Sequence, residues 1–196
     1  MENVEVSIRI TLPKEINSVL MKEKKRFVSE YGSSYKSEPH ITLYLGRYTE
    51  EGFPKLIADL KKISFEPVTF SLLGLKMNKG EHNNVYVVDV SNKTQLSELH
   101  VRVSEIASKY QSHLLREKEQ QRRGEGIFLE PSPFVPHITL GGIPLDATQP
   151  NIKEVRMNIK DAMGKEIHVG DMTVFYYGYK NKGDKSEIIE KVVIKF

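Results

Sequence analysis

The pentapeptide Pro-His-Ile-Thr-Leu occurs twice in this chain of 196 residues, at residues 39–43 and 136–140. Side chains alternate between the two faces of a strand, so each copy presents its histidine and threonine on one face and its aliphatic residues on the other. His40 and Thr42 then share one face, as do His137 and Thr139. Two such strands brought together would place two imidazoles and two hydroxyls around one site.

This set of side chains fits the cleavage of a phosphodiester. A base must take a proton from the attacking water or hydroxyl, and an acid must give a proton to the leaving oxygen. Histidine titrates near about 6.5, so both of its forms are available near neutral pH. The threonine hydroxyls can donate to the non-bridging oxygens, where charge accumulates in the transition state. Such chemistry requires no metal, and we expect no cofactor.

The elements that must position these residues repeat along the chain. Each half is predicted to run helix, His strand, helix, strand, strand, and the two histidines lie 97 residues apart. We therefore expect an α+β fold of two pseudo-symmetric lobes, each an antiparallel sheet with helices on its outer face, around a central cleft. We expect one two-lobed domain, with approximate repeats over residues 1–92 and 93–196. Strands are predicted at residues 4–12, 40–45, 68–75, 85–90, 136–140, 167–179 and 188–196, and helices at residues 13–31, 53–63, 92–114 and 152–162.

Composition excludes several classes of protein. The chain has no cysteine, which rules out disulfides, thiolate zinc sites and a cysteine nucleophile. No apolar run approaches the roughly 20 residues that span a membrane, and we expect no signal peptide. The formal net charge of +3 is compatible with a polyanionic ligand but too small to argue for one. We expect a cytoplasmic protein, acting as a monomer and away from membranes.

The two His-x-Thr-Leu motifs resemble those of the 2H phosphoesterase superfamily, which includes the 2′-5′ RNA ligase-like proteins, the 2′,3′-cyclic phosphodiesterases and the 2′,5′-oligoadenylate phosphodiesterases. The resemblance covers almost the whole chain in element order. It implies catalytic roles for His40 and His137, and phosphate binding by Thr42 and Thr139. Many members carry a basic or bulky residue just after the second motif, where this chain has Gly141-Gly142. The sequence therefore does not identify the cation that anchors the substrate.

Three functions remain open from the sequence. The leading hypothesis is a metal-independent phosphodiesterase that hydrolyses 2′,3′-cyclic phosphates or 2′-5′ linkages, with RNA ends or small oligonucleotides as substrates. The second is the reverse reaction, a 2′-5′ RNA ligase, because one site serves both directions. The third is an RNA-end-binding protein with little turnover, for which a duplicated site that has lost its activity would suffice.

Other residues give weaker signals. Tyr44 follows Thr42 along its strand, and we expect it to line the cleft, with Tyr177 as a second residue there that can stack on a base. The mixed-charge segment 116–123 is read as a solvated helix end that can also track an RNA backbone. The remaining histidines show no metal-ligand spacing and are read as surface or flanking residues, namely His82, His100, His113 and His168.

Overall fold

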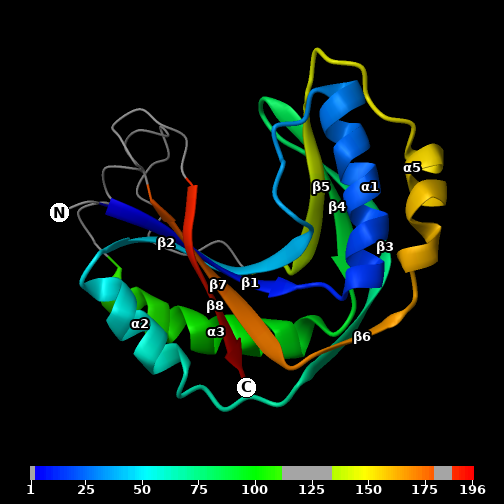
Figure 1. Cartoon of the computed structure of the whole chain (residues 1–196). Helices are drawn as coiled ribbons and strands as arrows, with labels where there is room; N and C mark the ends of the chain where they lie inside the picture. The colour runs from blue at the N-terminus through cyan, green and yellow to red at the C-terminus, as the bar shows by residue number, and fades with distance from the viewer. Residues whose placement is uncertain (1–2, 112–133, 179–186) are drawn as a thin grey trace.

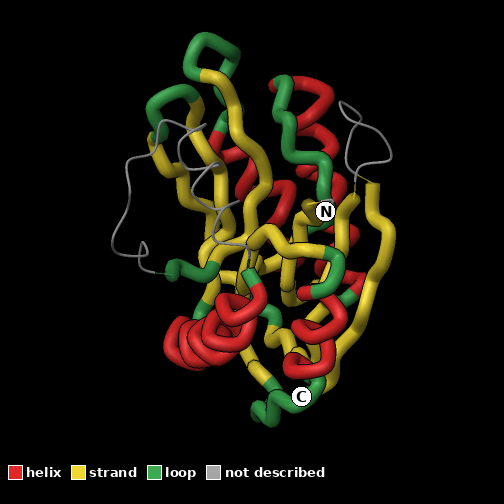
Figure 2. The backbone as a smooth tube through the Cα atoms, turned by 90° about the vertical axis from the view of Figure 1, so that its left-hand side faces the viewer, coloured by secondary structure: helices red, strands yellow, loops and turns green. Residues whose placement is uncertain are grey.

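The computed structural model describes residues 3–111, 134–178 and 187–196. Its strands form one curled antiparallel sheet in the order β6-β3-β4-β5-β2-β1-β7-β8. Helices lie on the outer side of the curl in both halves of the sheet (Figure 1). Figure 2 shows the chain turned by 90°, with the strands spanning most of the width of the molecule.

The helices and strands alternate along the chain much as the hydrophobic periodicity predicts. The strands are β1 (Asn3–Thr11), β2 (His40–Thr49), β3 (Val68–Lys79), β4 (Asn83–Val90), β5 (His137–Pro144), β6 (Glu166–Val169), β7 (Asp171–Gly178) and β8 (Glu187–Lys195). The helices are α1 (Lys14–Tyr31), α2 (Gly52–Leu60), α3 (Lys93–Tyr110) and α5 (Ile152–Ile159), with a 3₁₀ turn η1 (Lys160–Ala162) after the last.

The curled sheet has two halves, and its architecture confirms the expected α+β class. One half is β2-β1-β7-β8, against which α2 and α3 pack, and the other is β5-β4-β3-β6, against which α1 and α5 pack. Each half of the sheet takes two strands from the first part of the chain and two from the second. The spatial lobes are therefore not the two sequence repeats. The chain crosses between the two lobes repeatedly.

Within the described residues, a single strand-paired residue pair joins the two halves of the sheet. Ile41 of β2 pairs with Ile138 of β5, and both side chains are fully buried. These are the central residues of the two repeated pentapeptides. Every other strand pair in the sheet extends over at least four residues, so β2 and β5 diverge on either side of this contact.

Helix α1 carries the apolar stripe that the sequence predicts. Ile16, Leu20 and Phe27 are buried, and Gly32 ends the helix in the left-handed conformation at φ 71°, which glycine adopts without steric cost. Lys24 also lies on this stripe, and only 2% of the residue is exposed. A charged side chain at a core position is expensive unless something pairs with it.

Two glycines after the second motif allow close packing on β5. A Cβ placed on Gly141 would lie 2.5 Å from Cδ1 of Phe27 and 2.9 Å from Oγ of Ser33. A Cβ on Gly142 would lie 2.7 Å from Cε2 of Tyr35. The Gly-Gly pair that departs from the family pattern thus lets α1 and the segment after it approach the strand that carries His137.

Several boundaries differ from those predicted. The strand predicted at residues 167–179 is two strands, β6 and β7, which separate at Gly170 and pair in different halves of the sheet. Asn92 precedes α3 in the left-handed conformation and makes no side-chain cap; its amide donates to the carbonyl of Thr69 and to Oε1 of Gln95. The end of the helix predicted at residues 92–114 lies outside the described residues. Within the described residues, every helix is too short or too polar to cross a bilayer.

We predict that Gly141→Ala lowers the free energy of unfolding by about 1 to 3 kcal/mol, the usual cost of overpacking a core. The added methyl group would collide with the Phe27 ring and the Ser33 hydroxyl. Urea denaturation measures the change. Gly170→Ala is the matched control, since a Cβ there meets no atom within 4 Å. Equal stability of the two variants would contradict the close packing of α1 on β5.

Candidate active site

The pairing of Ile41 with Ile138 brings the polar residues of the two motifs together. The strands are antiparallel, so the residue before each isoleucine faces the residue after the other. His40 is thereby placed beside Thr139, and Thr42 beside His137. The two histidines become diagonal neighbours on one face. In a regular antiparallel pair, the Cα atoms of such neighbours are about 7–8 Å apart. We call this face, opposite the helices, the inner face.

Both imidazoles are held in the same way. Nδ1 of His40 lies 2.6 Å from the carbonyl of Glu38, and Nδ1 of His137 lies 2.7 Å from the carbonyl of Val135. A carbonyl only accepts, so Nδ1 must carry the hydrogen in each ring. Nε2 is therefore the nitrogen available to a ligand in both cases.

The proline of each motif accounts for this shared geometry. Pro39 and Pro136 each follow the residue whose carbonyl holds the imidazole. A residue before proline is restricted to extended conformations. The carbonyl two positions before each histidine is thus fixed relative to the strand that follows it.

Arg9 supplies a cation that the sequence analysis did not identify. It pairs with Thr42 in the β1–β2 register, so its side chain lies on the inner face. Nε donates to Oγ of Ser7 over 2.7 Å, and the guanidinium carbon lies 4.8 Å from the ring centroid of Phe175. Burial lowers the pKa of Arg9, although an arginine stays charged at neutral pH. In the sequence, Arg9 could have been noticed as a single basic residue on the polar face of a strand with alternating hydrophobicity.

Lys24 is the second cation missed. Its Nζ donates to the carbonyl of Thr139 over 2.9 Å, at the point where β5 diverges from β2. Burial, together with the nearby charge of Arg9, lowers the pKa of Lys24 to about 8. The sequence signal was a lysine in register with the buried stripe of α1, four residues after Leu20.

These groups leave positive charge that the protein itself does not neutralise. Neither Arg9 nor Lys24 forms an ion pair with any carboxylate in the described part of the chain. Burial lowers the pKa of His40 to about 4, and the charges of Arg9, Lys24 and His137 act in the same direction. His40 is therefore neutral at pH 7, beside two cations. An anion bound here would stabilise both cations and would raise the pKa of His40.

Tyr44 does not lie with the histidines. Ile8 pairs with Tyr44 and Arg9 pairs with Thr42, so Leu43 is left over as a β-bulge. The bulge reverses the alternation, and Tyr44 packs against the core on the side of α3, where its hydroxyl donates to Oε1 of Gln111 over 2.7 Å. The simple alternation that places Tyr44 beside Thr42 fails at this one residue.

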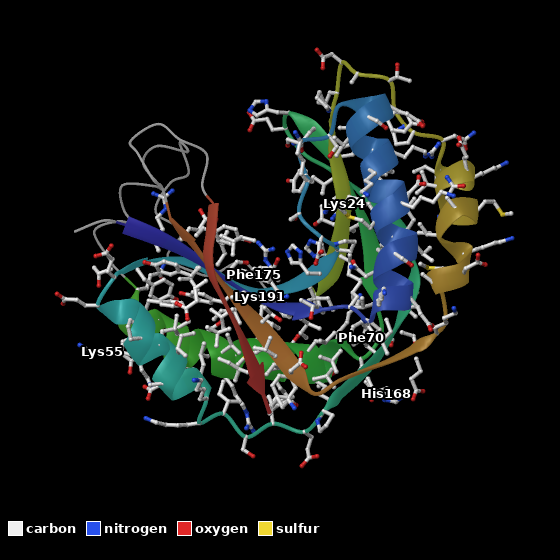
Figure 3. All side chains as sticks on the ribbon, in the orientation of Figure 1. Lys24, Lys55, Phe70, His168, Phe175 and Lys191 are labelled. Atoms are coloured by element: carbon white, nitrogen blue, oxygen red, sulfur yellow. The ribbon has the colours of Figure 1, made fainter. Side chains whose placement is uncertain are left out.

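Tyr177 lies on the inner face, as alternation predicts. Its ring stacks at 6.3 Å from that of Phe175, and the guanidinium of Arg9 lies 5.6 Å from its centroid. Lys191 of β8 approaches the same Phe175 ring at 5.5 Å, and Figure 3 labels this lysine and phenylalanine. Tyr176 points to the other face and packs on Phe53. Tyr179 lies outside the described residues.

His100 was expected to be a surface or flanking residue, and it lies against the segments that flank both motifs. It is half-buried on α3, its Nδ1 lies 2.6 Å from the carbonyl of Leu43, and its ring stacks on Phe134 with centroids 4.0 Å apart. One imidazole thus contacts the first motif at its bulge and the segment that leads into His137. His82 and His168 are exposed, whereas His113 and the basic segment 116–123 lie outside the described residues.

No metal site is apparent in residues 3–111, 134–178 and 187–196. No group of three or more histidine, aspartate or glutamate side chains there is arranged to hold an ion. The carboxylate nearest the histidines is Asp89, which pairs with His137 in the β4–β5 register and forms ion pairs with Lys76 and Lys93. Glu5 and Glu38 attract Arg9 without forming an ion pair with it. The arrangement offers two imidazoles, two hydroxyls and two cations to one anionic group.

The model of the 2′-5′ RNA ligase superfamily matches residues 21–173, which span both motifs. The chain belongs to this superfamily. This membership agrees with the 2H phosphoesterase resemblance drawn from the paired motifs. No curated protein sequence matches the chain closely enough to count as a relative.

Solved structures share the fold of this superfamily member at low sequence identity. Escherichia coli LigT in its apo form has a TM-score of 0.63 at 17% identity, with all of both chains covered. TT0787 of Thermus thermophilus has a TM-score of 0.61 at 21% identity, with 97% of each chain covered. LigT complexed with 3′-AMP has a TM-score of 0.59 at 17% identity, with 99% of each chain covered. These likenesses confirm the fold.

We predict that Lys24→Met stabilises the folded protein by about 1 to 3 kcal/mol at pH 7 and weakens phosphate binding. Between pH 8 and 10.5 the unfolded chain binds a proton at Lys24 that the folded chain has released. The free energy of unfolding therefore rises with pH through that window. Below pH 8 the buried charge of Lys24 lowers the free energy of unfolding by its full amount. Methionine removes this cost but loses the hydrogen bond to Thr139, worth about 1 kcal/mol.

Urea denaturation at pH 7 and pH 10.5 measures this effect. The advantage of Lys24→Met over the wild type should shrink at the higher pH, where the folded protein holds the lysine in its neutral form. Lys22→Met, a position on the same helix outside the buried stripe, is the control. A constant difference at both pH values would show that the charge of Lys24 is not what destabilises the fold.

Proposed function

We propose that this protein is a metal-independent phosphodiesterase that opens 2′,3′-cyclic phosphates or cleaves 2′-5′ linkages at RNA ends. The observation that carries the proposal is the Ile41–Ile138 pairing, which puts His40 and His137 on one face with Nε2 free in each. Arg9 and Lys24 add positive charge at the same place. The site residues are His40 and His137 for proton transfer, and Thr42 and Thr139 for the phosphate.

The proposed reaction begins with His40 as the base. The buried, neutral imidazole takes a proton from a water as the water oxygen bonds to phosphorus. The bond from phosphorus to one ribose oxygen then breaks, and His137, in its protonated form, gives a proton to that oxygen. The threonine hydroxyls and the two cations stabilise the charge on the non-bridging oxygens. At the end, His40 holds one more proton and His137 one fewer, and exchange with solvent restores both.

The solved relatives support an anionic nucleotide as the ligand. Structures of Escherichia coli LigT were determined with phosphate and with 3′-AMP, and that of Kluyveromyces marxianus Usb1 with uridine monophosphate. A 3′-phosphate next to a ribose 2′-hydroxyl is a product of opening a 2′,3′-cyclic phosphate. A 3′-phosphate is also the kind of anion that Arg9 and Lys24 would bind.

The ligase direction uses the same groups. By microscopic reversibility, a ribose hydroxyl can replace water and attack a cyclic phosphate to form a 2′-5′ bond. An RNA-end-binding protein with little turnover is disfavoured because both imidazoles are intact and held in equivalent positions. Product analysis separates these three functions.

The test of the proposal is a product screen. The protein is incubated with 2′,3′-cyclic AMP, with 2′-5′ oligoadenylate and with 3′-5′ oligoadenylate, with and without EDTA. We expect turnover of one of the first two that chelation does not reduce. Loss of activity with EDTA and its recovery with zinc or manganese would contradict the metal-independent mechanism, as would inertness toward all three.

We predict that His40→Ala and His137→Ala each lower kcat by roughly 10² to 10⁴, the usual effect of removing a general acid or base. The double variant should be little worse than either single variant, because the two residues act as a unit. His168→Ala, an exposed histidine on β6, should be unaffected and controls for nonspecific effects. Near-normal activity of either single variant would exclude the paired mechanism.

We also predict that the acid limb of the kcat/KM profile lies near pH 4. This limb reports the base of the free enzyme, and the pKa of His40 is lowered to about 4, chiefly by burial. As pH falls through this value, His40 becomes protonated and activity is lost, whereas the alkaline limb marks loss of the proton from the acid. An acid limb at the ordinary histidine value of about 6.5 would show that another group is the base.

A further inference from the structure

A pocket of about 370 Å³ lies between α1 and the segment that leads to β2. It is lined by Met21, Lys24, Lys25, Val28, Tyr35 and Lys36. Three of these six residues are lysines, and none is acidic. The other three offer a flat ring and two apolar side chains. A ligand that fits such a lining combines negative charge with a flat, weakly polar surface, as a nucleotide does.

The wall formed by Tyr35 is fixed by the packing around the Gly-Gly pair. Oγ of Ser33 accepts from the backbone N–H of Tyr35 and from that of Gly142, each over 3.3 Å. The Tyr35 ring lies against Gly142, where any Cβ would come within 2.7 Å of it. The pocket therefore does not depend on ligand binding to position its aromatic wall, which lowers the entropic cost of binding.

Lys24, labelled in Figure 3, lines this pocket and also contacts the strand that carries His137. Its Nζ donates to the carbonyl of Thr139, and its charge acts on His40. A chain that places one phosphate between His40 and His137 would thus meet Lys24 on leaving that site and continue into the pocket. The neighbouring lysines, Lys25 and Lys36, are exposed and line the same pocket as Lys24.

We propose that this pocket binds a second nucleotide of the substrate, with its phosphate at Lys25 and Lys36 and its base against Tyr35. The inference rests on the proposed function, since it assumes that a phosphate occupies the histidine site. It assigns the protein an oligonucleotide substrate rather than a free mononucleotide. The base contact is apolar and tolerates any base, because every base has a flat face.

The test compares two substrates that end in the same 2′,3′-cyclic adenylate. One is 2′,3′-cyclic AMP, and the other is a dinucleotide with this end and a 5′-phosphate. We expect wild-type kcat/KM to be at least about tenfold higher for the dinucleotide, because charge-assisted contacts to phosphate are strong. The double variant Lys25→Glu/Lys36→Glu should lose this preference while its kcat/KM for the mononucleotide stays within about twofold.

Lys22→Glu is the control for negative charge added to α1, because Lys22 is on the same helix but does not line the proposed pocket. It should keep the dinucleotide preference. Tyr35→Ala should reduce the preference without abolishing it, since only the stacking contact is lost. The proposal is overturned if the wild type shows no preference, if the double variant retains it, or if Lys22→Glu loses it equally.

A binding measurement separates this inference from the proposed function. Calorimetry with 3′-AMP and with a 5′-phosphorylated dinucleotide ending in a 3′-phosphate requires no turnover. We expect the wild type to bind the dinucleotide at least about tenfold more tightly than 3′-AMP. The double variant should bind the two ligands with equal affinity. If the wild type shows these affinities but turns over no substrate, the proposed hydrolase is refuted and the nucleotide pocket is supported. Equal affinities would refute the pocket whatever the activity.

Discussion

The contact between Ile41 and Ile138 is the constraint on which the rest of the site depends. It is the only residue pair that joins the two halves of the sheet in the described structure, and both side chains are fully buried. Antiparallel pairing at these residues turns a repeated pentapeptide into a site with approximate two-fold symmetry. The two buried isoleucines hold the strands together, and the residues on either side of them lie on the inner face.

Electrostatics make the two halves of this site unequal. His40 lies in a partly buried position beside Arg9 and Lys24, and the pKa of its imidazole is lowered to about 4. His137 is exposed at the start of β5. Approximate symmetry of the backbone therefore coexists with different environments for the two rings. This difference supports the assignment of one as base and the other as acid.

Lys24 lowers the stability of the fold at the position where the proposed phosphate would bind. Lys24 occupies a position on α1 where an apolar side chain would pack without a desolvation cost, and its pKa is lowered as a result. A bound phosphate would offset part of this cost by pairing with the charge. The glycines at 141 and 142 contribute to the same arrangement, since they let α1 bring Lys24 up to the carbonyl of Thr139.

The sequence predicted the residues of the two motifs, their strands and the shared face of each histidine and threonine. These features depend on local alternation, which a sequence displays directly. It predicted neither the strand order, in which each half of the sheet mixes both parts of the chain, nor the approach of Lys24 from a helix. Those depend on contacts between distant residues. Tyr44 illustrates a different limit, because one extra residue, Leu43, forms a bulge that turns it to the opposite face, and nothing in the local alternation marks that position.

The central claim is that both histidines act on one phosphate. A crystal structure of the protein with bound inorganic phosphate tests it most directly. The account predicts a single phosphate with one oxygen within about 3 Å of Nε2 of His40 and another within about 3 Å of Nε2 of His137. Arg9 or Lys24 should lie against the remaining oxygens. A phosphate held by only one imidazole, with the other turned away or beyond reach, would contradict the account.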